Sequence, residues 1–258
     1  MRLDLGTVLL QWSAGGLLGA WVTTRRRLVG PGYGWLLRGI YAALALGGAA
    51  AGLLASHGDA ASWIRDAAGL TMAIVTIGVG VGSVRRRRPA GEPGSFDPRF
   101  DLFAPIVGLV ALLAAAAAGG GPYALGAGRL VIGALFLGFI TDAMLLGHWY
   151  LVQPGLSRGP IKELVRLSAA VWPLEVAVLL IPTGMIDVLS GRIDDGYGGL
   201  LAVTWVVSAL TTLALLGVAW KALDEPYYSA VMAATGLLYL TILTAFGTDV
   251  LARALFSI

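Results

Sequence analysis

Two acidic residues stand inside stretches that are otherwise apolar enough to cross a membrane. Asp142 lies within RLVIGALFLGFITDAMLLGHW (129–149), and Glu175 lies within AVWPLEVAVLLIP (170–182). The two stretches are expected to form antiparallel helices. At a rise of 1.5 Å per residue, each carboxyl group should lie roughly 20 Å from the end of its helix at the outer side of the membrane, so both lie at one depth. Two carboxyls close together at one level would share a proton, because both cannot ionise cheaply in a low dielectric. The spacing therefore predicts a proton site at mid-bilayer.

Two threonines, Thr141 and Thr183, stand in or next to the same stretches. We expect Asp142, Glu175, Thr141 and Thr183 to form either a polar relay for protons or structural hydrogen bonds between helices. Pro182, and a further proline before Glu175, should disturb the second stretch, since proline removes a backbone hydrogen bond. Interrupted helices with buried acids are typical of transporters, although prolines also occur in ordinary membrane helices.

A histidine and two aromatic residues end the first stretch. His148, Trp149 and Tyr150 fit an aromatic belt at the membrane–water interface. They also fit a quinone or lipid-headgroup site, in which His148 donates to a carbonyl and the rings form the walls. The other histidine, His57, belongs to the opposite side of the bilayer. A bis-histidine haem held within this chain is therefore not expected.

Two further groups of charged residues have simpler interpretations. Asp249 and Arg253 are four residues apart, so we expect a structural ion pair on one face of a helix, close to its outer end. The segment GRIDDGYGG (191–199) lacks the ligand spacing and the closing Glu of a calcium loop, so we expect a solvated turn.

The composition indicates what kind of structure must position these residues. Of the 258 residues, 57% are hydrophobic and 13% are charged, whereas soluble domains carry about 25% charged residues. A membrane-spanning helix needs about 20 apolar residues. The sequence therefore predicts an all-α integral membrane protein, a polytopic bundle of about eight transmembrane helices in one membrane domain over 1–258. The expected spans are 3–23, 36–56, 64–84, 102–120, 129–152, 164–189, 200–221 and 228–255.

The connections between spans predict the orientation. Spans one to three lie in 1–84 and spans four to eight in 102–258, joined by a cytoplasmic linker over 85–101 that contains RRRRPAGEPG. Thirteen of the 18 basic residues fall in connections on one side, which by the positive-inside rule is cytoplasmic. These are Arg25, Arg26, Arg27, Arg38, Arg85, Arg86, Arg87, Arg88, Arg99, Arg158, Lys162, Arg166 and Lys221.

Both chain ends are therefore expected outside the cytoplasm, and the protein is expected to be a multi-pass protein of a bacterial inner membrane. The first span is about 20 residues long and is followed at once by Arg25, Arg26 and Arg27. A cleaved signal peptide has a shorter core with its charges on the other flank, so we expect a retained helix.

Several chemistries find no support in the sequence. The chain has no cysteine, which excludes thiol catalysis and thiolate metal sites. It also lacks the GxSxG, Walker, HExxH and dinucleotide motifs, and no metal site is expected. The basic residues are explained by topology, so we expect membrane lipids and other membrane subunits as partners and no nucleic acid.

Three functions remain open. The first is a membrane subunit of a respiratory or other electron-transfer complex, which anchors its partners and contributes to a quinone or proton site. Such a subunit would bind no cofactor by itself beyond a quinone or lipid at an interface. The second is a small proton-coupled secondary transporter that uses the interrupted span and its acids. The third is a structural or assembly protein without chemistry of its own.

Overall fold

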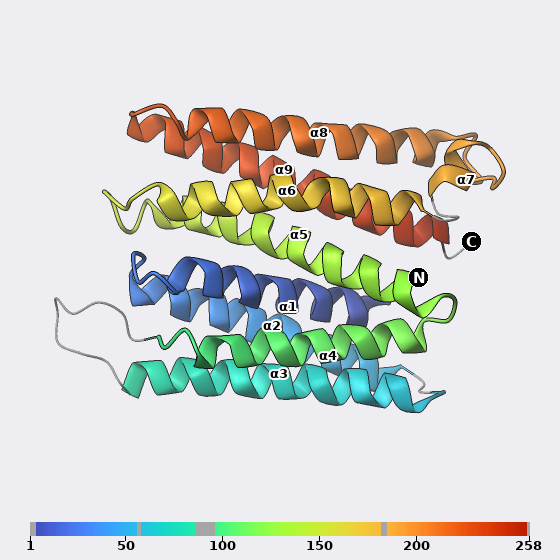
Figure 1. The fold of residues 1–258 in the computed structure, drawn as a ribbon, viewed down its shortest axis with the longest axis horizontal. Coiled ribbons are helices and arrows are strands. Elements are labelled where there is room, and N and C mark those ends of the chain that lie inside the picture. The colour runs from blue at the N-terminus through green and yellow to red at the C-terminus, as the bar shows by residue number, and fades with distance from the viewer. Residues whose placement is uncertain (1–3, 56–57, 86–95, 182–184, 257–258) are drawn as a thin grey trace.

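The computed structural model describes residues 4–55, 58–85, 96–181 and 185–256, and all regular structure in these ranges is helical (Figure 1). The helices are α1 (Leu5–Thr24), α2 (Pro31–Leu54), α3 (Ala60–Arg85), the 3-10 turn η1 (Phe100–Leu102), α4 (Phe103–Ala118), α5 (Tyr123–Trp149), α6 (Gly159–Leu180), α7 (Met185–Leu189), α8 (Leu200–Ala222) and α9 (Tyr228–Phe256).

Seven helical segments of the described chain are long and apolar enough to cross a membrane. They are α1, α2, α3, η1 together with α4, α5, α8 and α9. Helix α6 is 22 residues long but is not among them, and it carries Lys162, Glu163, Arg166 and Glu175. A chain with this many such helices is a multi-pass membrane protein.

The predicted continuous span over 164–189 is wrong in its bounds. Helix α6 begins at Gly159 and ends at Leu180, and Met185–Leu189 forms the separate helix α7. Ile181 is extended, with φ −107° and ψ 147°. The next residue in the sequence is Pro182, and a residue before proline is driven out of the α region. Pro182 itself lies outside the described residues, as does Thr183.

The third predicted span begins earlier than expected, because its charged residues are paired. Helix α3 starts at Ala60 and contains both Arg65 and Asp66. The Arg65 guanidinium lies 2.7 Å from the Asp66 carboxylate and 2.7 Å from the carboxylate of Asp4, the N-cap of α1. The pairing removes much of the cost of burying these charges.

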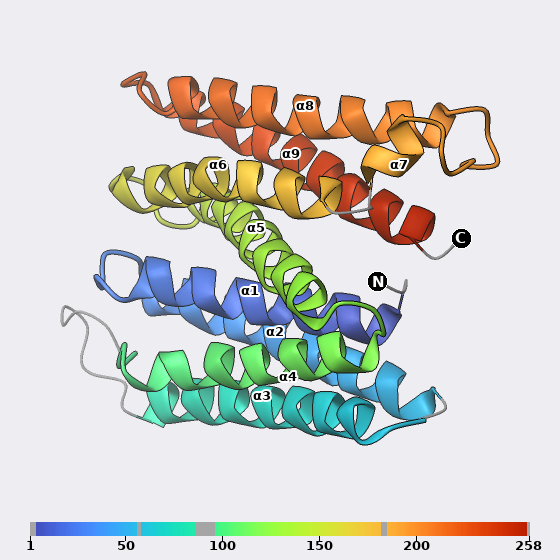
Figure 2. The ribbon, with the colours of Figure 1, turned by 45° about the vertical axis from the view of Figure 1, so that its right-hand side comes forward.

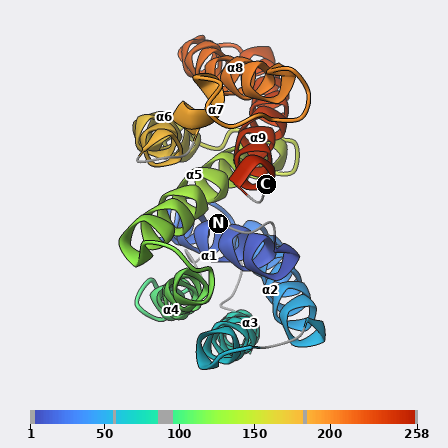
Figure 3. The same cartoon turned by 90° about the vertical axis from the view of Figure 1, so that its right-hand side faces the viewer.

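Successive long helices run antiparallel, and both described chain ends lie at the same end of the bundle (Figures 1 and 2). Helices α1 and α5 form the centre. Viewed end-on, α5 separates α1–α4 from α6, α8 and α9 (Figure 3), and it packs against α1, α4, α6 and α9. In their most apolar windows, 78% of α5 and 72% of α1 is buried, against 28% of α3 and of α8.

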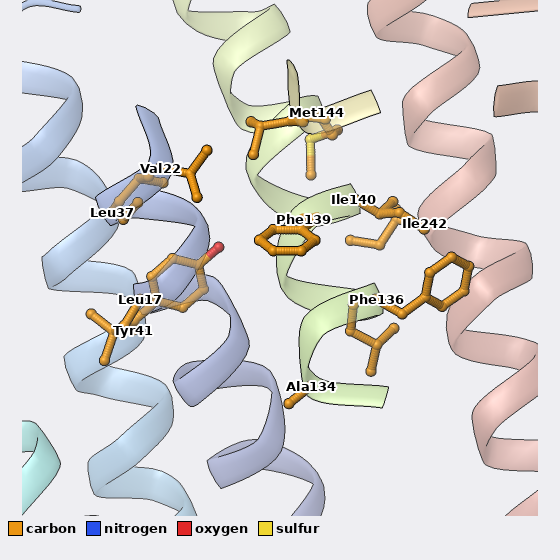
Figure 4. Close-up of a cluster of buried hydrophobic side chains, with 14 of the residues drawn as sticks. Leu17, Val22, Leu37, Tyr41, Ala134, Phe136, Phe139, Ile140, Met144 and Ile242 are labelled. Atoms are coloured by element: carbon orange, nitrogen blue, oxygen red, sulfur yellow. The ribbon is translucent and has the colours of Figure 1, made fainter. Parts of the chain in front are cut away.

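Helices α1 and α5 cross in close contact because small residues meet at the crossing. A Cβ at Gly15 would lie 1.7 Å from the backbone oxygen of Ala134, and one at Gly138 would lie 2.1 Å from the carbonyl carbon of Gly15. Small residues allow such close backbone approach in membrane proteins. Around the crossing, Phe139 of α5 lies between Tyr41 of α2 and Ile242 of α9 (Figure 4). This packing sets the rotation of α5, and with it the direction of Asp142.

Candidate functional site

Eight polar side chains, seven of them buried and one partly buried, form two clusters inside the bundle. The arginine cluster consists of Gln11 on α1, Glu175 on α6, and Asp249 and Arg253 on α9. The aspartate cluster consists of Asp142 and Thr141 on α5, Tyr41 on α2, and Trp12 on α1. Polar groups buried among apolar helices need partners, so each cluster is described by its hydrogen bonds.

In the arginine cluster, the side chain of Arg253 connects two helices. Its Nε donates to Asp249 Oδ2 over 2.7 Å, so the ion pair predicted from the four-residue spacing is present. Its Nη2 donates to Gln11 Oε1. The pair lies near the end of α9 and is enclosed by the bundle, since Arg253 is 0% and Asp249 2% exposed. The Arg253 guanidinium is buried because Gln11 of α1 packs against it and accepts its hydrogen bond.

Glu175 is the fourth member of the arginine cluster, and it lies beside the others without a hydrogen bond to Asp249 or Arg253. A Cβ at Gly133 of α5 would lie 2.2 Å from Gln11 Nε2 and 3.5 Å from Glu175 Oε1, so both side chains lie over the same glycine. Asp249 and Arg253 are the charged groups that interact with Glu175. Neither is hydrogen-bonded or ion-paired to it, although all three side chains are buried.

Each member of the arginine cluster keeps one polar atom without a protein partner. The atoms are Gln11 Nε2, Arg253 Nη1, Glu175 Oε2 and Asp249 Oδ1. Two are donors, and two are acceptors when the carboxyls are ionised. Buried polar atoms are nearly always hydrogen-bonded, so this set fits a small hydrophilic ligand, water or a transferable proton.

The end of α6 lies beside the arginine cluster and is held by Arg129 of α5. The Arg129 guanidinium donates to the backbone oxygens of Val178 over 2.8 Å and of Ile181 over 3.4 Å. The last carbonyls of a helix have no partner within the helix, and a cation at this end is favourable. Glu175 is five residues before the end of α6, and Pro173 lies two residues before Glu175.

In the aspartate cluster, Asp142 is completely buried and accepts a hydrogen bond from the Tyr41 hydroxyl at Oδ1. Its Oδ2 has no protein partner and lies against Gly19 of α1, where a Cβ would be 2.4 Å away. Thr141 accepts from Trp12 Nε1 over 2.8 Å and donates to the backbone oxygen of Leu137. The hydrogen-bond partner of the Asp142 side chain thus comes from α2, not from α6.

The expected proximity of Asp142 and Glu175 is not found. Glu175 lies next to Gly133, and Gly133 and Asp142 are nine residues apart on α5, which is roughly 13 Å along the helix axis. The prediction measured the depth of Glu175 from Leu189, but α6 ends at Leu180. Thr141 bonds within the aspartate cluster, and Thr183 lies outside the described residues.

His148, Trp149 and Tyr150 do not form one pocket. His148 is exposed, whereas Tyr150 is buried and donates to the Ser157 backbone oxygen over 2.7 Å. The Trp149 ring lies 5.9 Å from that of Tyr33 in a tilted arrangement, and the Tyr33 hydroxyl donates to the Asp142 backbone oxygen. The two rings therefore fix the end of α5, whereas His148 takes no part in this contact.

The turn at 191–199 is held by hydrogen bonds from backbone N–H groups to an aspartate side chain. Asp195 Oδ1 accepts from the backbone N–H groups of Gly199 and Tyr197, each over 2.9 Å, and Oδ2 accepts from Leu201 over 3.0 Å. Residues 191–194 and 196–198 are exposed, as expected for a solvated turn, whereas Asp195 is 2% exposed. The hydrogen bond from Gly199, followed by those from Tyr197 and the start of α8, lowers the pKa of Asp195.

Sequence reasoning missed Gln11, Arg129 and Tyr41. Each is a polar residue within or beside an apolar span, which is a signal in itself. The sequence gives no spacing that links Gln11 to Arg253, because they are 242 positions apart.

The fold and these buried clusters define the class: a multi-pass helical membrane protein with polar side chains enclosed in its bundle. No protein-family model, curated protein or solved structure matches this chain.

Proposed function

We propose that this protein is a proton-coupled membrane transporter in which the arginine cluster binds and releases the coupling proton. The observation that carries the proposal is the set of four unpartnered polar atoms on Gln11, Arg253, Glu175 and Asp249. They come from α1, α6 and α9, so a relative movement of these helices changes their separation. Two buried carboxyls near one guanidinium cannot both ionise cheaply, so one of them can hold a proton and pass it on.

The end of α6 supports the same proposal. Transporters place ion sites beside interrupted helices, where free carbonyls line the site. Glu175 is five residues from the end of α6, and Arg129 binds the carbonyls of Val178 and Ile181. The aspartate cluster supplies a third enclosed carboxyl, Asp142, deeper in the bundle.

The proposed orientation places both chain ends outside the cytoplasm. At one end of the bundle Arg25 binds Glu163 over 2.6 Å, Lys162 binds Asp224 over 2.6 Å, and Arg158 binds the 223–227 turn. By the positive-inside rule we assign this basic end to the cytoplasm of a bacterial cell. The other two functions, an electron-transfer subunit and an assembly protein, stay predictions. No contact of His148 or of another described side chain favours either function.

Proton flux through liposomes tests the proposal. The full chain is reconstituted in phosphatidylcholine liposomes loaded with a pH-sensitive dye, and a potassium gradient with valinomycin imposes a membrane potential. We expect proton entry with the wild-type protein and none with Glu175→Gln, because an amide cannot carry the proton. Glu163→Gln is the control on the same helix, since Glu163 pairs with Arg25 and Arg26 at the basic end.

Two results would overturn the proposal. One is a wild-type flux no greater than that of protein-free liposomes. The other is equal flux through the wild-type protein and Glu175→Gln, which would leave the arginine cluster with a structural role.

A further inference from the structure

A cavity of about 460 Å³ lies between α2 and α3, and no residue of either buried cluster lines it. It exists because small residues face each other across these helices. Gly39 of α2 and Gly80 of α3 both line the cavity, and a Cβ at either position would meet no atom within 4 Å. Helices α2 and α3 are neighbours in the end-on view (Figure 3) and contact each other, so the cavity is a local gap in a packed pair.

The polar wall of the cavity lies at the basic end of the bundle. Arg38 is already engaged, since it is 2.8 Å from Asp101 and its guanidinium lies 3.8 Å from the centre of the Phe96 ring. Arg85, in contrast, is exposed at the end of α3 and makes no ion pair with the described residues.

The rest of the cavity wall is apolar and open to the membrane. Ile77 is 47%, Val81 47% and Val84 49% exposed on the surface of α3. On the other side, Trp35 donates from its indole N–H to Ser83 Oγ over 2.7 Å, which fixes the ring across the two helices. An apolar wall that ends at a tryptophan and a free arginine matches an acyl chain joined to a charged headgroup.

We propose that this cavity, which forms an open groove between α2 and α3, binds one anionic phospholipid. Its phosphate group lies at Arg85, and one acyl chain lies along Ile77 and Val81 over Gly39 and Gly80. Basic pockets between membrane helices on the cytoplasmic side are recognised sites for anionic headgroups. The groove selects its ligand by negative charge at the headgroup and by the space that the two glycines leave for a chain.

Native mass spectrometry of the full-length protein tests the lipid site. The protein in mild detergent is titrated with phosphatidylglycerol and, separately, with phosphatidylcholine of the same acyl chains. We expect one phosphatidylglycerol to bind in preference to phosphatidylcholine. Arg85→Gln should weaken this binding about fivefold, the effect of one basic residue near a membrane surface. Gly80→Leu should abolish the preference by filling the groove.

Matched variants separate a groove from general surface charge. Gly78→Leu is on the same helix, where a Cβ also meets no atom, but Gly78 does not line the cavity. Arg166→Gln removes an exposed arginine of α6 at the same end of the bundle. Both controls should bind phosphatidylglycerol as the wild-type protein does. Unchanged binding in Gly80→Leu, or equal loss in Arg85→Gln and Arg166→Gln, would overturn the proposal, and neither result depends on proton transport.

Discussion

Arg253, near the end of α9, donates a hydrogen bond to Gln11, in the second turn of α1, across 242 residues of chain. Both side chains are 0% exposed. This contact joins the first and last long helices of the bundle, and it brings the Asp249–Arg253 pair next to Glu175. Asp249 and Arg253 alone would form an ion pair within one helix. The contact with Gln11 makes this pair part of an enclosed polar cluster.

Removal of the cation from the arginine cluster should destabilise the protein strongly. Arg253→Met leaves Asp249 buried without its partner, and breaking a buried ion pair from one side costs about 3–5 kcal/mol. Asp249→Asn together with Arg253→Met should cost less than the sum of the single changes, because no charge of the pair remains. Unfolding in SDS or heat measures the free energies. Additive effects would contradict a direct interaction between the two side chains.

Loss of one hydroxyl should weaken the aspartate cluster. Tyr41→Phe removes the donor to Asp142 Oδ1, and the acceptor is then left unsatisfied in a buried position. We expect a loss of about 1–3 kcal/mol in the free energy of unfolding. Tyr239→Phe is the control, because Tyr239 is 44% exposed on α9. The two variants should differ clearly in thermal stability, and equal stability would mean that the Tyr41 hydroxyl contributes nothing.

The turn before α8 should make stability depend on acid pH. The pKa of Asp195 is lowered in the folded protein by the backbone N–H of Gly199 and its neighbours, so the unfolded chain binds a proton more readily. The stabilisation is complete above the unfolded pKa, about 4, and is lost as the pH falls through the lower folded value. Melting temperatures of the wild-type protein and Asp195→Asn should therefore converge on acidification from pH 6 to below pH 3.

Asp194→Asn is the control for the turn, since Asp194 accepts one backbone N–H, from Gly196, over 2.9 Å. Its effect on the melting temperature should be smaller than that of Asp195→Asn at pH 6. A difference between wild type and Asp195→Asn that stays constant with pH would argue against a charged cap at this position.

The sequence by itself determined that the chain forms long apolar helices, because the periodicity and length of its apolar stretches are local properties. It also indicated the Asp249–Arg253 contact, since residues four apart on a helix are neighbours whatever surrounds them. A disturbance at Pro182 was indicated as well, because proline restricts the residue before it, although the span was expected to continue to 189. These features depend on residues only a few positions apart.

The tertiary structure alone decided which polar groups meet. Asp142 and Glu175 were expected to pair, but Asp142 bonds to Tyr41 and Glu175 lies with Gln11 and Arg253. The direction of a side chain depends on how far its helix is rotated and shifted against the others. In this bundle the close contact of Gly15 with Gly138 fixes the rotation and shift of α1 and α5, and no local pattern in the sequence specifies that contact.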